Sequence, residues 1–78
     1  MTTPTRTGHV GTCTEYQRDG RRLAAAGEET IDQMVRYSAQ YPNTYHRYRG
    51  TNGYVTWAYG GREIAPGSLP LPLRNLAS

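Results

Sequence analysis

The chain has 78 residues, a formal net charge of +3 and a single cysteine, Cys13. A chain of this length forms one domain and buries only about 60 to 65% of the surface that its unfolded form exposes, so its core is small. One cysteine excludes an intramolecular disulfide framework and a cysteine-based zinc site, and no apolar run has the length of a signal peptide or a membrane span. We therefore expect a soluble, cytoplasmic protein. A homodimer that covers one face or edge of its sheet would relieve the shortage of core.

The basic residues of the chain are all arginine, and no lysine occurs. The planar guanidinium group suits phosphate, carboxylate and the faces of aromatic rings. A GC-rich genome favours arginine codons and would give the same composition. The charge therefore supports only a modest preference for anionic partners.

The chain begins with a segment, residues 1–7, that we expect to be a flexible arm. Residues 8–16 alternate in the manner of a strand, and Asp19-Gly20 is the signal of a two-residue hairpin turn. Such a turn predicts three cross-strand pairs: Arg18 with Arg21, Tyr16 with Leu23, and Thr14 with Ala25.

Residues 21–26 fit two structures. Three consecutive alanines favour helix by propensity, and a helical stripe would then contain Leu23, Gly27, Ile31, Met34, Ser38 and Tyr41. Against this, Gly27 inside a helix would cost about 1 kcal/mol. The acidic residues Glu28, Glu29 and Asp32 also match the composition of a first helical turn. We favour a strand over residues 21–26, followed by a separate helix.

The spacing of apolar residues predicts a helix over residues 28–40. Ile31, Met34, Val35 and Ser38 follow the i, i+3, i+4, i+7 spacing of one buried face, which Tyr41 extends. Pro42 ends the helix, because the residue before a proline is disfavoured in the α region.

Two more turn signals, Asn52-Gly53 and Gly60-Gly61, predict a three-stranded antiparallel sheet over residues 45–65. A two-residue loop at the first turn places Tyr48 opposite Trp57 and Arg47 opposite Ala58. A two-residue loop at the second places Trp57 opposite Ile64 and Ala58 opposite Glu63. Because side chains alternate between the two faces of a strand, this register predicts a core face of His46, Tyr48, Val55, Trp57, Tyr59 and Ile64. It predicts an exposed face of Tyr45, Arg47, Arg49, Tyr54, Thr56 and Glu63.

The chain closes with a proline-rich tail, residues 66–78, in which leucine and proline alternate from Leu69 to Leu73. This alternation predicts an extended or polyproline II segment. We expect Leu69, Leu71 and Leu73 to fold back onto the core. The alternative is that the tail is a proline-rich ligand for an aromatic groove on a partner. The complete prediction is a small α+β domain over residues 8–65, in the order ββαβββ, with one helix packed on an antiparallel sheet.

Residues with catalytic or metal-binding chemistry are few. His9, His46, Cys13 and Glu15 do not have the spacing of a nucleophile pair or of a metal site. We therefore expect a protein without enzymatic activity, cofactor or bound metal.

The predicted exposed face favours a binding function. Arg47 and Arg49 lie on it beside Tyr45 and Tyr54, and arginine with tyrosine on a β surface is typical of proteins that bind single-stranded nucleic acid. Arginines at the first hairpin extend this surface: Arg18, Arg21 and Arg22. We therefore expect a non-enzymatic binding module for a nucleic acid or a nucleoprotein assembly.

The alternative function is that of a protein–protein inhibitor or adaptor. Tyrosine, tryptophan and arginine are the residues most enriched in binding hot spots. Small cofactor-free chains of unusual composition are also frequent among phage-type inhibitors of host machinery, including the anti-CRISPR proteins. This likeness is one of size and style, and no sequence motif supports it.

Overall fold

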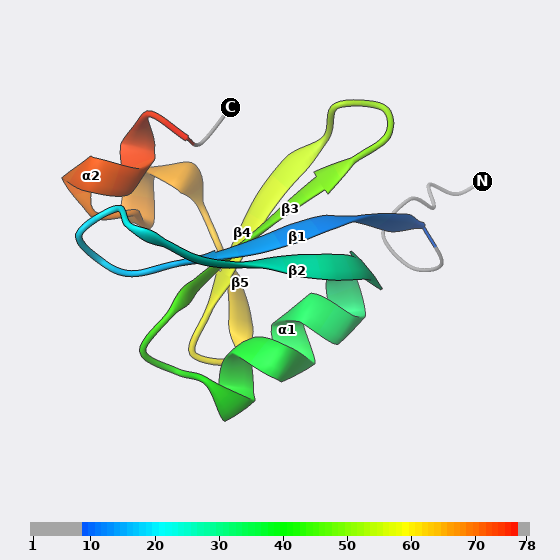
Figure 1. Ribbon diagram of the computed structural model, residues 1–78, viewed down its shortest axis with the longest axis horizontal. Helices are drawn as coiled ribbons and strands as arrows, with labels where there is room; N and C mark the ends of the chain where they lie inside the picture. Colours follow the sequence, from blue (N-terminus) through cyan, green and yellow to red (C-terminus); the bar gives the residue numbers. More distant parts are fainter. Residues whose placement is uncertain (1–8, 77–78) are drawn as a thin grey trace.

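The computed structural model describes residues 9–76, except for the side chains of residues 24–26, and forms a five-stranded antiparallel sheet with one packed helix (Figure 1). The predicted arm, residues 1–7, lies outside this range. The strand order is β2-β1-β3-β4-β5, and the predicted ββαβββ arrangement is confirmed. The elements are β1 (Val10–Tyr16), β2 (Arg22–Thr30), α1 (Ile31–Gln40), β3 (Tyr45–Gly50), β4 (Val55–Tyr59), β5 (Arg62–Ile64), the 3-10 helix η1 (Pro66–Ser68) and α2 (Leu71–Arg74).

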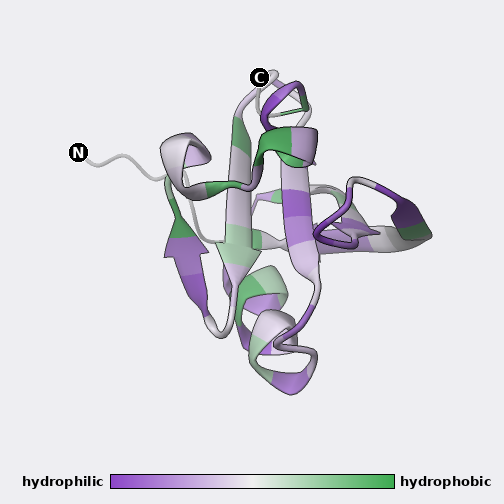
Figure 2. Cartoon of the chain, turned by 90° about the vertical axis from the view of Figure 1, so that its left-hand side faces the viewer, coloured by the Kyte–Doolittle hydropathy of each residue, from purple (hydrophilic) through white to green (hydrophobic). Residues whose placement is uncertain are grey.

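The sheet is covered on both faces. The helix α1 packs on one face, which we call the helix face, and residues 66–76, the C-terminal segment, pack on the other, which we call the outer face (Figure 2). Each cover has its own small core. The helix-face core contains Cys13, Ile31, Met34, Tyr48 and Ala58, with Val35 partly buried. The outer-face core contains Tyr45, Trp57, Leu69 and Leu73, with Tyr16, Val55, Tyr59, Ile64 and Leu76 against it.

The predicted register between β3 and β4 is wrong by one residue. Arg47 lies opposite Trp57 and Tyr48 opposite Thr56, because the loop between the strands has three residues, 51–53, closed by the Gly50 N–H donating to the Tyr54 carbonyl at 2.8 Å. A two-residue type I′ turn needs positive φ at both central residues. Here only Gly53 has it, at 88°, while Asn52 accepts a hydrogen bond from the Tyr54 N–H at 3.0 Å through its side-chain oxygen.

A shift of one residue exchanges the faces of a strand. Trp57 therefore shares the outer face with Arg47, and His46 and Tyr48 point to the helix face. Thr56 and Tyr45, which were expected to be exposed, are buried. The predicted core residues are all buried or half-buried, but they are divided between two cores instead of forming one.

The first hairpin repeats this geometry. Its loop also has three residues, 18–20, since the Gln17 N–H donates to the Arg21 carbonyl at 2.8 Å, and only Gly20 has positive φ. Tyr16 consequently lies opposite Arg22 instead of Leu23, whereas the predicted pair of Thr14 with Ala25 is confirmed. Between these two pairs β2 contains one extra residue, Leu23, and this irregularity returns the pairing of β1 with β2 to the predicted register. The third turn, Gly60-Gly61, has positive φ at both residues, and the predicted pairs of β4 with β5 are confirmed.

The helix α1 is shorter than predicted. It begins at Ile31, and Thr30 caps it: the Thr30 hydroxyl accepts from the Gln33 N–H at 3.1 Å, and the Gln33 side chain accepts from the Thr30 N–H at 2.8 Å. This capping box satisfies two backbone donors. Glu28 and Glu29 therefore belong to β2, which has nine residues and ends at Thr30. Ile31, Met34 and Ser38 are buried as predicted, but Tyr41 is 49% exposed beyond the end of the helix.

The C-terminal segment is compact instead of extended. Proline at the first turn of a helix loses no hydrogen bond, because the N–H of that position has no partner within the helix. Pro66 and Pro72 occupy such positions in η1 and α2. The prediction that the leucines fold back is confirmed for Leu69 and Leu73, which are 1% and 0% exposed, but is wrong for Leu71, which is 71% exposed.

The two leucines of α2 provide a matched test of this packing. Replacing Leu73 with alanine should lower the free energy of unfolding by about 2 to 5 kcal/mol, the range for a buried leucine. The same change at the exposed Leu71 should alter it by less than about 0.5 kcal/mol. Urea unfolding followed by the fluorescence of Trp57, the only tryptophan, measures both. Equal effects at the two positions would contradict the described packing.

Candidate functional site

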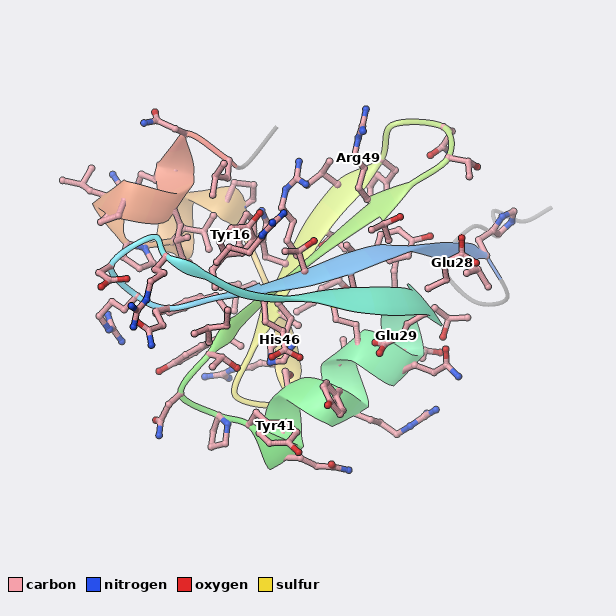
Figure 3. The ribbon with its side chains drawn as sticks, in the orientation of Figure 1. Tyr16, Glu28, Glu29, Tyr41, His46 and Arg49 are labelled. Carbon is pink, nitrogen blue, oxygen red and sulfur yellow. The ribbon has the colours of Figure 1, made fainter. Side chains whose placement is uncertain are left out.

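The open part of the outer face is a hollow of about 370 Å³ beside the C-terminal segment. Its polar side chains come from three adjacent strands, because Thr12 of β1 lies opposite both Arg49 of β3 and Glu28 of β2, and Thr14 lies opposite Arg47. Val10, Gly11, Gly50 and Thr51 complete the lining. Figure 3 shows Arg49 and Glu28 on the side of the sheet away from α1. The lining of the hollow therefore contains two guanidinium groups, three hydroxyl groups and one carboxylate.

The two arginines of the hollow differ in their surroundings. Arg49 is exposed. Arg47 is half-buried, and its Nε donates to the Leu76 carbonyl at 2.9 Å. Arg47 therefore connects β3 to the C-terminal segment as well as lining the hollow, whereas Arg49 is the arginine more accessible to a ligand.

The close approach of β1 to β3 at this site depends on Gly11. A Cβ atom at this position would come within 2.6 Å of the Arg49 carbonyl oxygen and of the Tyr48 ring. Any larger residue would therefore push apart the two strands that carry Thr12 and Arg49.

Charged side chains are distributed unequally between the two faces of the sheet. Strand register and contacts place six arginines on the outer face and its cover: Arg18, Arg22, Arg47, Arg49, Arg62 and Arg74. The same criteria place four acidic residues on the helix face and α1: Glu15, Glu29, Asp32 and Glu63. The exceptions among residues 9–76 are Glu28 on the outer face, Arg36 on α1, and Arg21, which alternates to the helix face; Asp19 lies in the first hairpin turn. The outer face is therefore basic and the helix face acidic.

The structure brings together only part of the predicted binding surface. Arg47 and Arg49 share the outer face as expected. Tyr45 lies on the same face but is buried at 4% exposure, with its ring stacked on Tyr59 at 4.1 Å. Tyr54 is exposed but lies opposite Gly50, which alternation places on the helix face. The predicted tyrosine rings are therefore not available beside the arginines.

The hairpin arginines lie at the opposite end of β1 from the hollow. Arg18 is exposed, and its guanidinium lies 5.7 Å from the centre of the Tyr45 ring. Arg21 and Arg22 are also exposed. The turn itself contacts α2, since a Cβ at Gly20 would lie 3.1 Å from Pro72. Arg18 and Arg22 extend the basic surface past the C-terminal segment, whereas Arg21 alternates to the helix face; none of the three lines the hollow.

Sequence reasoning missed four polar residues of the hollow: Thr12, Thr14, Thr51 and Glu28. The alternation of Val10, Thr12 and Thr14 with Gly11 and Cys13 was a signal that the two threonines share a face. The missing information was the long-range pairing of β1 with β3. Glu28 was missed because it was assigned to a helix instead of a strand.

A second polar cluster lies on the helix face around His46 (Figure 3). His46 is 2% exposed, its Nε2 lies 3.0 Å from the Thr44 hydroxyl, and its Nδ1 lies 3.9 Å from a Glu15 carboxylate oxygen. The Thr44 hydroxyl donates its proton to the Tyr41 carbonyl, so we assign the imidazole proton to Nε2 as the donor. Burial lowers the pKa of His46, and the nearby Glu15 carboxylate opposes this shift. The imidazole is therefore neutral at pH 7.

The cysteine near this cluster is not an activated nucleophile. Burial, and then the Glu29 carboxylate, raise the pKa of the Cys13 thiol to about 12. A catalytic cysteine needs a lowered pKa, because the thiolate is the reactive form. Among residues 9–76, no group of three or more histidine, cysteine, aspartate or glutamate side chains could hold a metal ion. Neither α-helix of the described chain is long and apolar enough to cross a membrane.

Comparison with known proteins finds no protein-family model, no curated protein and no solved structure that matches this chain.

The raised pKa of Cys13 predicts an unreactive thiol. At about pH 8, iodoacetamide should leave Cys13 unmodified in the folded protein and alkylate it in urea, as measured by mass spectrometry. Alkylation of the folded protein faster than of the unfolded protein would contradict this prediction and would indicate an activated thiol.

The lowered pKa of His46 predicts that the protein loses stability as the pH is lowered below about 6.5. Above the usual histidine pKa of 6.5, both folded and unfolded states are neutral at this residue and contribute no pH dependence. Below it the unfolded state binds a proton first, so the free energy of unfolding decreases until the pH reaches the lowered pKa of the folded state. Urea unfolding at about pH 7.5 and about pH 5.5 measures this loss. His46→Gln, which cannot titrate, should lose less stability over the same interval, and an equal loss would contradict the assignment.

Proposed function

We propose that this protein is a non-enzymatic binding module that contacts the phosphate backbone of a nucleic acid, free or in a nucleoprotein assembly, through its outer face. The observation that carries the proposal is the separation of charge between the two faces of the sheet. Arginines on one face attract a polyanion, and the acidic helix face repels it, so the protein binds in one orientation. The proposal keeps the cytoplasmic location predicted from the sequence.

The composition of the hollow supports contact with phosphate groups. Guanidinium groups donate paired hydrogen bonds to phosphate oxygens, and the hydroxyls of Thr12 and Thr14 are further donors that proteins use on nucleic-acid backbones. The carboxylate of Glu28 at the edge of the hollow repels phosphate and restricts where the backbone can lie.

The burial of Tyr45 and the position of Tyr54 change the expected mode of binding. Stacking of bases on tyrosine was part of the sequence-based prediction, but these rings do not accompany the arginines. Contacts to phosphate carry little sequence information. We therefore propose binding that depends strongly on salt and weakly on sequence.

The proposal is tested with fluorescently labelled single-stranded and duplex oligonucleotides of mixed sequence, whose binding is measured by anisotropy at several salt concentrations. The logarithm of the affinity should fall linearly with the logarithm of the salt concentration. Arg49→Glu should weaken binding roughly tenfold at low salt and reduce the slope by about one, as expected for the loss of one phosphate contact.

The matched control is Arg36→Glu, which makes the same charge change on α1, at the other face. Its effect should be much smaller than that of Arg49→Glu, and the melting temperatures of both variants should stay close to that of the wild-type protein. Equal weakening by the two variants would reject the outer face as the binding surface. Binding to neither oligonucleotide would overturn the proposal and leave the protein–protein inhibitor or adaptor as the remaining candidate.

A further inference from the structure

Among residues 9–76, no strand pairs with the outer edge of β2. The sheet order places β2 at one edge and β5 at the other. The strand β5 has three residues, whereas β2 has nine, from Arg22 to Thr30, with no proline and no lysine. Edge strands are usually protected by short length, proline or lysine, because their free backbone groups can pair with another strand. These three protections are missing from β2, and the two that it has, charged residues and register irregularities, are placed so that an identical antiparallel strand matches them.

One end of β2 is basic and the other end is acidic. Arg21 and Arg22, both exposed, stand at its start, and Glu28 and Glu29 stand near its end. Residues 23–27 between them carry no charge. A strand that runs antiparallel to an identical copy brings its basic end against the acidic end of the copy.

We propose that two copies of this chain form a symmetric dimer by antiparallel pairing of their β2 strands about Ala25. In this register Arg22 of one copy lies opposite Glu28 of the other, and Arg21 lies opposite Glu29. Opposite charges in directly facing positions stabilise antiparallel pairs, and like charges destabilise them. A two-fold axis at Ala25 forms each of these pairs twice.

The faces of the side chains agree with this register. Arg22 pairs with Tyr16, and Glu28 pairs with Thr12, so both point to the outer face. Glu29 pairs with Gly11 on the helix face, and Arg21, one residue before Arg22, alternates to the same face. Facing residues of an antiparallel pair share a face, so a register shifted by one residue would separate each arginine from its carboxylate.

In this register, each irregular position of β2 in one copy also lies opposite an irregular position of β2 in the other copy. Leu23 lies in one register shift against β1, and residues 26–27 lie in the other. Pairing about Ala25 places Leu23 opposite Gly27. Leu23 is 41% exposed, and a Cβ at Gly27 would meet no atom within 4 Å. The space beside each Gly27 can therefore receive the exposed leucine of the other copy.

The dimer would have a continuous ten-stranded sheet. Because the two-fold axis is perpendicular to the sheet, the basic outer faces of both copies lie on the same side. The inference does not depend on the proposed nucleic-acid binding, since it rests on the edge of the sheet and is tested by mass alone.

Charge exchange tests the pairing by sedimentation equilibrium at low salt from micromolar to millimolar protein. The wild-type chain should reach twice its mass of 8.7 kDa. In Arg22→Glu each new carboxylate faces the Glu28 carboxylate of the other copy, and in Glu28→Arg each new guanidinium group faces Arg22 of the other copy. The dimer of each variant alone should therefore have a roughly tenfold higher dissociation constant. An equimolar mixture of the two should associate like the wild-type chain. The double variant, Arg22→Glu with Glu28→Arg, should also recover the dimer.

Circular dichroism and the fluorescence of Trp57 show whether each variant is folded, and Arg36→Glu on α1 is the matched control that should leave the dimer unchanged. A wild-type chain that stays monomeric over the whole range overturns the proposal. So does a dimer that both charge variants leave intact, or one that neither the mixture nor the double variant restores.

Discussion

The burial of Trp57 is the constraint on which the rest of the structure depends. Trp57 lies on β4, inside the sheet, and faces away from α1, so α1, the longest helix of residues 9–76, cannot cover it. Leu69 and Leu73 of the C-terminal segment cover it instead, and Trp57 is 0% exposed. Burying about 200 Å² of aromatic surface contributes roughly 5 kcal/mol, from which the buried Nε1–H of Trp57, unpaired within the described chain, subtracts about 1 to 3 kcal/mol. This is comparable with the total stability of a small domain, so the C-terminal segment belongs to the core rather than to an appended tail.

The extent of this cover also determines where the binding surface lies. The C-terminal segment packs over the aromatic end of the outer face, around Tyr45, Trp57 and Tyr59. The end that carries Thr12 and Arg49 stays open as the hollow. Arg47 lies at the boundary, since its Nε donates to the Leu76 carbonyl. A change at Arg47 therefore disturbs both packing and charge, whereas a change at Arg49 addresses charge alone.

Most of the fold could be predicted from local sequence, and the errors have identifiable causes. The order of strands and helix, the buried face of α1 and the Gly60-Gly61 turn follow from apolar spacing and from the need for positive φ, and the structure bears them out. The start of α1 was misplaced because acidic residues were taken as a first turn, while the capping box of Thr30 and Gln33 was overlooked. The form of the C-terminal segment depends on contacts with Trp57, which is distant in sequence, so its local Leu-Pro pattern could not predict it.

The predicted binding surface was wrong because two hairpin loops have three residues instead of two, and in both loops the side-chain oxygen of an Asp or Asn accepts a backbone hydrogen bond. Asp19 and Asn52 each accept a hydrogen bond from the N–H two residues later, both at 3.0 Å, and each precedes the one glycine of its loop with positive φ. This turn adds a third loop residue, and the added residue shifts the register. The shift removes Tyr54 from the face of Arg49 and places Trp57 opposite Arg47. The outer face is therefore sorted into an aromatic part that leucine covers and a basic part that stays open. A surface of tyrosine and arginine can bind a nucleic acid by stacking on its bases and by attracting its phosphates. With the tyrosines covered or on the other face, only the electrostatic attraction remains on the open part of the outer face.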